Sequence, residues 1–254
     1  MGIFRRRPPE DALPEGWRSL LAERIRHWEY LSDDERDQLG HLSGQLLSEK
    51  HWEASNGFDL TTEMKMLIAA QASLLVLGLS FGHFREVSAI IVHPTTVVLT
   101  GPRGSAVSGL MTDSPMPILG QAAEWGPIII AWDAVLNDCR HPERGHNVVF
   151  HEFAHKLDML DHVVDGTPPL QRDQWERWVE VCTREYESLQ AGGDDVLGDY
   201  ASVNPAEFFA VATEAFFDIP VRLRDQKLEL YEVLAAFYNQ DPAARVERSA
   251  SRGT

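Results

Sequence analysis

The sequence contains only two cysteines, Cys139 and Cys182, among its 254 residues. Two thiols cannot build the framework of several disulfides that holds small secreted domains together, so the fold has to depend on a hydrophobic core. The content of 44% hydrophobic residues is sufficient for such a core in a chain of this length. Because few cysteines are also typical of a reducing compartment, we expect the protein to be cytoplasmic.

Long hydrophobic runs are lacking as well. No stretch approaches the ~18 uninterrupted apolar residues of a membrane-spanning helix, and the most apolar segment, Leu67 to Leu79, is interrupted by Gln71 and Ser73. The segment from Met1 to Pro9 is basic, but no long apolar segment follows it as in a secretory signal. The sequence therefore predicts neither a membrane span nor a membrane partner.

The chain has fewer positively charged than negatively charged residues. The chain has 23 lysines and arginines against 39 aspartates and glutamates, which gives a formal net charge of −16. An acidic surface repels the phosphates of nucleic acids and of anionic lipids. Nucleic acid is therefore not expected as a direct partner, and the acidity is explained by solubility alone.

The chain is organised around residues 151–155, His-Glu-Phe-Ala-His, which have the H-E-x-x-H pattern of helical zinc hydrolases. Residues four apart in an α-helix lie on one face, so the imidazoles of His151 and His155 can reach the same ion. Glu152 lies about 100° around the helix, where its carboxylate can take a proton from a metal-bound water. With Asn147 as N-cap, the segment predicts a helix that carries one Zn²⁺ per chain.

Helical patterns dominate the rest of the chain. Helices are expected over residues 17–30, 32–49, 61–77, 172–190, 204–217 and 223–238. Short β-branched runs predict strands over residues 87–92, 95–99 and 128–133, with 106–110 as a further candidate. These elements predict an α+β fold that is mostly helical, with a small mixed β-sheet next to the H-E-x-x-H helix. We expect a flexible tail over residues 1–14, a helical N-terminal region packed on the core over 15–84, a catalytic region over 85–242 and a flexible tail over 243–254.

The strand over residues 128–133 has two interpretations. A substrate peptide could pair with it if it forms an edge of the sheet, because main-chain hydrogen bonds give affinity that tolerates many sequences. Its three consecutive isoleucines suit an interior strand equally well. His93, which precedes a proline at a strand junction, is interpreted as structural.

A catalytic zinc usually has three protein ligands, so a third ligand is required beside the two histidines. Asp158, Asp161 and His162 follow closely in the sequence. A metzincin-like arrangement needs a glycine at the position of Asp158 to allow a sharp turn, and this disfavours the nearby residues.

Two carboxylates lie further along the chain, on one stripe of an apolar helix: Glu207 and Glu214. A carboxylate in such a helix needs either a cation or a full set of hydrogen bonds. Glu207 is a candidate metal ligand, but its position after Asn204 is also that of a capping-box glutamate. Glu214 could instead accept a hydrogen bond from a ligating imidazole. Spacing alone does not choose between them.

Residues 147–158 and 200–211, together with 49–50 and 68–72, resemble the Mlc titration factor A family of bacterial cytosolic zinc peptidases. In that family, as in the similar catalytic domain of anthrax lethal factor, a tyrosine lies seven residues before the glutamate ligand. Tyr200 and Glu207 have this spacing. The resemblance therefore implies a zincin-like catalytic core in which Glu207 is the third ligand and Glu214 supports a ligand.

The same resemblance implies a gluzincin-like metallopeptidase with weak, aminopeptidase-like activity on a peptide or protein substrate. Glu152 would be the general base, and Tyr200 would donate a hydrogen bond to the oxyanion. A transcriptional repressor like Mlc, which regulates sugar uptake, is the implied partner. Two alternatives remain: a regulatory module that sequesters a transcription factor and has a vestigial zinc site, and a zinc hydrolase that acts on a small amide.

Overall fold

The computed structural model describes residues 13–55, 57–95, 126–192 and 196–252. The fold is α+β and mostly helical, as predicted. Its strands are β1 (His51–Ala54), β2 (Ala89–His93) and β3 (Ile128–Ala131). Its helices are α1 (Trp17–Arg24), α2 (His27–Tyr30), α3 (Asp33–Glu49), α4 (Thr62–Leu75), α5 (Trp132–Arg140), α6 (Val148–Asp158), α7 (Trp175–Gln190), α8 (Pro205–Asp218), α9 (Pro220–Gln226), α10 (Leu228–Tyr238) and α11 (Pro242–Arg252). Short 3-10 turns are η2 (Phe81–Phe84), η3 (Pro142–Arg144), η4 (Met159–Asp161) and η5 (Asp199–Ser202).

The sheet differs from the prediction in one respect. It was expected to be mixed, but both pairings between the described strands are parallel, in the order β1-β2-β3. Strand β1 escaped prediction because it has only four residues, none of them β-branched, and it joins the sheet only by pairing with β2. The strands expected over residues 95–99 and 106–110 lie outside the described residues, apart from Thr95.

Helix starts follow the capping chemistry of the sequence closely. Ser32 opens α3 with a full capping box to Glu35, and the Thr61 hydroxyl accepts a hydrogen bond from the Met64 N–H at the start of α4. Two expected helices are divided, because the backbone is extended at Ile25 between α1 and α2 and leaves the helical region at Lys227 between α9 and α10. Propensity did not indicate these breaks.

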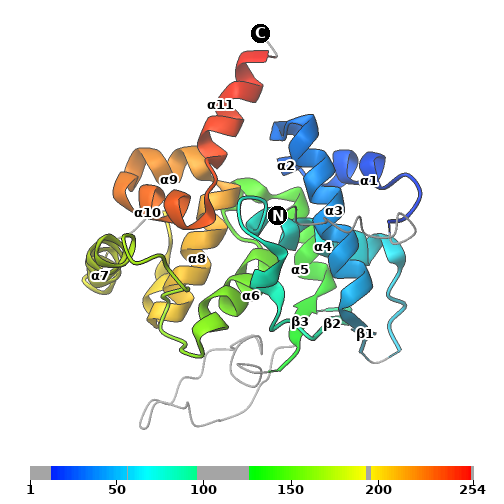
Figure 1. Cartoon of the computed structure of the whole chain (residues 1–254), viewed down its shortest axis with the longest axis horizontal. Helices are drawn as coiled ribbons and strands as arrows, with labels where there is room; N and C mark the ends of the chain where they lie inside the picture. Colours follow the sequence, from blue (N-terminus) through cyan, green and yellow to red (C-terminus); the bar gives the residue numbers. More distant parts are fainter. Residues whose placement is uncertain (1–12, 56, 96–125, 193–195, 253–254) are drawn as a thin grey trace, which may run out of the picture.

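The structure corrects the prediction of a flexible tail over residues 243–254, since α11 extends to Arg252 (Figure 1). The Asp241 carboxylate accepts hydrogen bonds from the Ala244 N–H at 3.0 Å and from the Tyr231 hydroxyl at 2.6 Å. Pro242 occupies the first helical position and Ala243 is fully buried. Because residues 243–254 are mostly small or polar, the helix start at Asp241 and Pro242 was not identified from the sequence.

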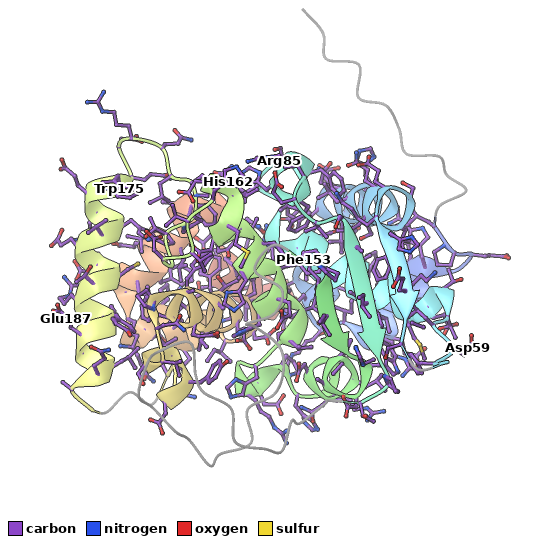
Figure 2. All side chains as sticks on the ribbon, turned by 90° about the horizontal axis from the view of Figure 1, so that it is seen from below. Asp59, Arg85, Phe153, His162, Trp175 and Glu187 are labelled. Carbon is purple, nitrogen blue, oxygen red and sulfur yellow. The ribbon has the colours of Figure 1, made fainter. Side chains whose placement is uncertain are left out.

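Helices α6 and α8 form the middle of the molecule (Figure 1). On one side lie the sheet and helices α1 to α4, and on the other lie α7, α9 and α10. Buried side chains from all these regions form one hydrophobic cluster. Phe153 of α6 lies inside it, 4.9 Å between ring centroids from Phe84, whereas Trp175 and Glu187 lie on the outer face of α7 (Figure 2). Both central helices are therefore held by packing on two sides.

Within the described ranges, no helix is both long enough and apolar enough to cross a membrane.

A close backbone contact joins the loop after α6 to the start of α8. Gly166 has φ of +77°, and a Cβ placed there would lie 2.1 Å from the carbonyl oxygen of Pro205. We expect Gly166→Ala to lower the free energy of unfolding by about 2–4 kcal/mol in chemical denaturation, because strain and overlap add. Gly16→Ala is the matched control: its φ is +72° in the left-handed region but nothing lies within 4 Å, so about 1 kcal/mol is expected. Equal losses in both variants would contradict the contact.

Candidate metal centre

Asn147 fixes the start of α6, the helix that carries the H-E-x-x-H motif. Its side-chain oxygen accepts hydrogen bonds from the N–H groups of Val149 and Phe150, both at 3.1 Å. Its own N–H donates to Glu214 Oε2 at 2.6 Å, and its side-chain amide donates to Gln71 Oε1 at 2.9 Å. The N-cap predicted from sequence is thus also tied to α8 and to α4.

The apolar face of α6 is as predicted. Val149, Phe153 and Leu157 are fully buried, and Leu160 beyond the helix is 4% exposed. The histidines lie on the other side, where His151 and His155 side chains keep 12% and 10% of their surface exposed. The helix therefore buries one face in the core and directs the other toward α8.

Three side chains converge opposite that core. His151 Nε2 lies 3.0 Å from Glu207 Oε2 and 3.1 Å from His155 Nε2, and His155 Nε2 lies 3.6 Å from Glu207 Oε2. Ligands about 2.0 Å from a tetrahedral ion lie about 3.3 Å from one another. In the part of the chain that the structure describes, this is the one group of His, Cys, Asp and Glu side chains whose atoms could hold a metal ion.

The candidates for the third metal ligand lie at different distances from the two histidines. Glu207 keeps half of a capping box, since its N–H donates to Asn204 Oδ1 at 2.9 Å, but its carboxylate lies against the histidines. Asp158 faces elsewhere: Oδ2 accepts a hydrogen bond from the Gly166 N–H at 3.0 Å. Asp161 and His162 do not join the three converging side chains either.

Glu214 supports the site from the side. Its Oε1 lies 2.7 Å from His151 Nδ1, while Oε2 accepts the N–H of Asn147. A carboxylate can only accept, so His151 donates through Nδ1, and its Nε2 is the ring nitrogen on the side of His155 and Glu207. Glu214 thus lies against His151 Nδ1, and its role in orienting a metal ligand stays a prediction.

Burial and charge shift the pKa values of this cluster strongly. Burial disfavours the charged imidazole of His151, but the adjacent carboxylates of Glu207 and Glu214 outweigh it and raise its pKa well above the usual range. Burial also opposes the charge on Glu207, yet the adjacent imidazoles of His151 and His155 lower its pKa. Burial, together with the negative charge of Glu207, raises the pKa of Glu152 to about 8. A cation bound beside these groups would favour the ionised form of Glu152 and so lower its pKa.

The two residues predicted to act in catalysis flank these three side chains. Glu152 is 6% exposed, and its Oε1 has no hydrogen-bond partner among the described residues. Tyr200, on η5, is 42% exposed, and its ring centroid lies 5.9 Å from that of His151. Burial and the nearby Glu207 carboxylate raise the pKa of Tyr200, so its hydroxyl stays protonated at neutral pH.

A family model described as glucose-regulated metallo-peptidase M90 matches residues 3–239 of the chain. The chain belongs to this family. Because M90 proteins are a family of metallopeptidases, membership implies a metal, and the three converging side chains form a group that could hold one.

Relatives of this M90 chain extend over most of its length. An uncharacterised protein of Synechocystis sp. is 34% identical, covering 91% of this chain and 86% of that protein. Mlc titration factor A of Edwardsiella ictaluri is 31% identical, covering 97% of this chain and 95% of that protein. Mlc titration factor A of Serratia proteamaculans is 32% identical, covering 91% and 89%. The expected resemblance to the Mlc titration factor A proteins is confirmed.

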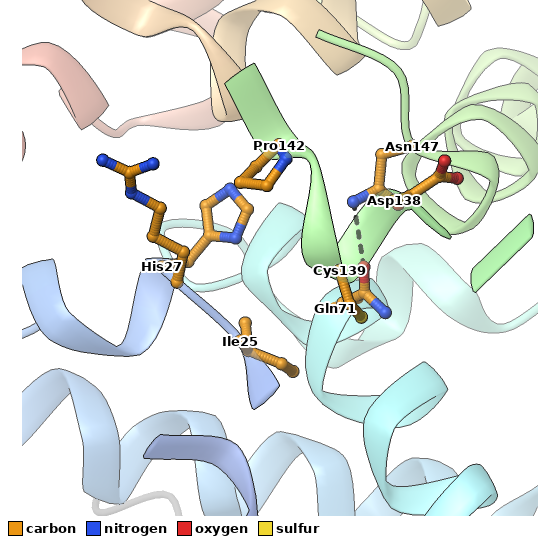
Figure 3. A pocket seen from close by; sticks show the side chains of 8 residues that line it. Ile25, His27, Gln71, Asp138, Cys139, Pro142 and Asn147 are labelled. Atoms are coloured by element: carbon orange, nitrogen blue, oxygen red, sulfur yellow. Dashed lines mark hydrogen bonds between the residues drawn. The ribbon is translucent and has the colours of Figure 1, made fainter. Parts of the chain in front are cut away.

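Sequence reasoning missed the polar residues behind the M90 centre. Asp138 of α5 accepts a hydrogen bond from the Val148 N–H at 2.9 Å, and Gln71 of α4 holds the Asn147 side chain (Figure 3). Between them lies a cavity of about 10 Å³, roughly the space of one water molecule. Asp138 was missed because α5 was not predicted, and Gln71 because it was considered only as an interruption of an apolar helix.

Proposed function

We propose that this chain is a zinc-dependent, gluzincin-like metallopeptidase in which His151, His155 and Glu207 hold one Zn²⁺. The observation that carries this proposal is the convergence of two imidazoles and one carboxylate at 3.0–3.6 Å. Two nitrogens and one oxygen suit zinc and leave a fourth position open. When bound, zinc supplies a Lewis acid that lowers the pKa of water and polarises the scissile carbonyl.

Glu152 moves the protons in this proposal. It accepts a proton from the attacking water and then delivers it to the amine that leaves. The position of Glu152 supports this role. The residue follows His151 on α6, it is almost fully buried, and its Oε1 has no hydrogen-bond partner among the described residues. A buried carboxylate oxygen without a partner is poised to bind a water or a substrate proton.

Tyr200 is proposed to donate a hydrogen bond from its hydroxyl to the oxyanion that develops on the substrate carbonyl. Its ring beside His151 and its raised pKa support this role, because the hydroxyl keeps its proton while the carbonyl oxygen gains charge. Its partial exposure leaves the ring accessible to a substrate.

The test is metal analysis of the purified protein combined with hydrolysis of a peptide panel. We expect about one zinc per chain and cleavage of peptides. Panel members with free and acetylated amino ends test the further proposal of aminopeptidase-like preference, and small amides test the alternative substrate class. Protein that binds no metal, or zinc protein that cleaves no peptide, would overturn the peptidase proposal.

Glu214→Gln is expected to weaken zinc binding by about 10–100-fold. A glutamine offers one acceptor oxygen, whereas Glu214 accepts from both His151 and Asn147, so one of these donors would face an NH₂ group. Competition with a chelator measures the affinity. The control is Glu187→Gln, an exposed glutamate on α7, which should leave zinc affinity unchanged, and an unchanged affinity in Glu214→Gln would contradict the orienting role.

A second candidate function follows from the name of several relatives, Mlc titration factor A. In this proposal the chain acts in the cytoplasm by binding a transcriptional repressor like Mlc and so regulates sugar uptake. Calorimetry with the Mlc-like repressor of the same organism tests it directly. Equal binding by wild type and Glu152→Gln would support a role independent of hydrolysis, and no binding by either would exclude this function.

A further inference from the structure

Large apolar side chains are exposed at few places in the part of the chain that the structure describes. They are Val163, Trp175, Val179, Tyr200, Val203 and Leu228. Three of them belong to α7 and α10, and the other three belong to the segment that follows α6 and to the segment that leads into α8. A single exposed apolar side chain is ordinary, but apolar groups gathered beside a polar centre are typical of a ligand site.

The turn η5 carries two of these side chains on one face. The Val203 N–H donates to the Tyr200 carbonyl oxygen at 3.2 Å, and Val203 has φ of −64° and ψ of −48°, so the turn extends through Val203. Side chains three residues apart eclipse each other in a 3-10 helix. Tyr200 and Val203 therefore lie on the same face of η5, where Val203 is 53% exposed, whereas Ala201 is fully buried in the core.

This face of η5 is the one beside the metal centre. The ring centroid of Tyr200 lies 5.9 Å from that of His151, and the Glu207 carboxylate is close enough to the Tyr200 hydroxyl to raise its pKa. Val203 directly precedes Asn204, the N-cap of α8, and so lies four residues before Glu207. The valine is thus tied to one metal ligand by the chain and to the neighbour of another by the turn.

The segment after α6 reaches the same end of α8. Asp158 Oδ2 accepts the Gly166 N–H at 3.0 Å, and a Cβ at Gly166 would lie 2.1 Å from the carbonyl oxygen of Pro205. The exposed Val163 lies between Asp158 and Gly166, on a loop that is anchored at both ends. Both segments that meet at the start of α8 therefore carry an exposed valine.

A peptide bound for hydrolysis would lie across the Tyr200–Val203 face. In the proposed reaction the scissile carbonyl accepts a hydrogen bond from the Tyr200 hydroxyl. The rise of a 3-10 helix is about 2.0 Å per residue, so Val203 lies about 6 Å along η5 from Tyr200. An extended peptide advances about 3.4 Å per residue. Val203 therefore lies within about two residues of the scissile bond.

We propose that Tyr200 and Val203 form a subsite for a large apolar side chain next to the scissile bond, so that the substrates are peptides with leucine, isoleucine, methionine or phenylalanine at this place. Contact with the valine and the tyrosine ring removes apolar surface of both partners from water. The net charge of −16 and the exposed Asp199 beside Tyr200 disfavour an acidic residue there. The proposal rests on the proposed peptidase function, which supplies the occupant of the face.

The first test is kcat/KM of the zinc-loaded chain for two series of peptides with a constant frame. One series varies the residue before the scissile bond and the other varies the residue after it, each among alanine, leucine, phenylalanine and glutamate. We expect the leucine peptide to exceed the alanine peptide at least about 10-fold in one series, and the glutamate peptide to fall below both. Equal values for leucine and alanine in both series would overturn the subsite.

Val203→Ser locates the subsite. It should reduce the ratio of kcat/KM between the leucine and alanine peptides at least about three-fold, because a hydroxyl replaces the apolar contact. Val179→Ser is the matched control. This exposed valine of α7 lies about 10 Å along the helix from Tyr186, whose hydroxyl donates to Ser202 of η5, so its replacement should leave the ratio unchanged. An unaltered ratio in Val203→Ser would overturn the assignment.

A binding measurement separates the subsite from the peptidase proposal. Glu152→Gln, loaded with zinc, is titrated by calorimetry with a peptide that has leucine on both sides of the central bond and with its alanine counterpart. We expect the leucine peptide to bind at least about five-fold more tightly, and Val203→Ser in the same background to remove the difference. Equal binding of both peptides would overturn the subsite. A retained preference in a protein that hydrolyses no peptide would support the subsite and overturn the peptidase alone.

Discussion

Glu152→Gln is expected to retain zinc and to lower kcat for peptide hydrolysis by about 10²–10⁴-fold, the usual contribution of a general base. Glutamine has nearly the same shape, so the packing of α6 around Phe153 should not change. It cannot accept the proton of the attacking water, however. Glu152 also lies outside the three converging side chains, so its replacement removes no metal ligand.

The measurement is kcat by steady-state hydrolysis, together with zinc content of the same preparation. Glu187→Gln makes the same chemical change on the exposed face of α7 and should keep wild-type kcat. Turnover close to wild type in Glu152→Gln with zinc still bound would rule out Glu152 as the base. Loss of zinc in this variant would mean that the residue stabilises the site rather than transferring protons.

Tyr200→Phe is expected to lower kcat by about 10²–10³-fold, which is the effect of removing one oxyanion donor. The ring that lies 5.9 Å between centroids from His151 is kept, and only the hydroxyl is lost. Because the hydrogen bond forms as the oxyanion develops, KM should change much less than kcat. The free energy of unfolding should change by less than about 1 kcal/mol, since the side chain is 42% exposed.

Tyr186→Phe provides the matched control. The Tyr186 hydroxyl donates to the carbonyl oxygen of Ser202 at 3.3 Å, so this variant also removes a phenol hydroxyl beside η5. It should leave kcat nearly unchanged. Similar losses in both variants would show that η5 is merely disordered by the change, and an unaltered kcat in Tyr200→Phe would remove the tyrosine from the mechanism.

Local chemistry made helix starts predictable. Asn147 was predicted as an N-cap and the structure confirms it, and the side chains of Ser32, Thr61 and Asn204 likewise accept N–H groups within three residues of themselves. Strand β1 is different: its four residues acquire extended structure by pairing with β2, which is remote in sequence. No local pattern carries that information.

The divided helices have a similar explanation. Residues 17–30 keep an apolar periodicity through Ile25, but that residue is extended and its side chain is buried, with 3% exposed. Packing against the core outweighs the helical propensity of the segment there. Helix α11 shows the opposite error, since a helix was present where none was predicted. The composition of residues 243–254 indicated a flexible tail, although Asp241 and Pro242 form a specific helix start.

The sequence by itself determined the chemical groups of this protein: two histidines and a glutamate on one helix, an apolar helix with two carboxylates, and a tyrosine seven residues before the first of them. Only the tertiary structure decided that Glu207 lies against both histidines while Glu214 binds His151 Nδ1, across 63 residues of sequence. Periodicity fixes which residues share a face of one helix, but it contains nothing about the distance between two helices. That distance follows from the burial of α6 and α8 between the two sides of the core, to which the whole chain contributes.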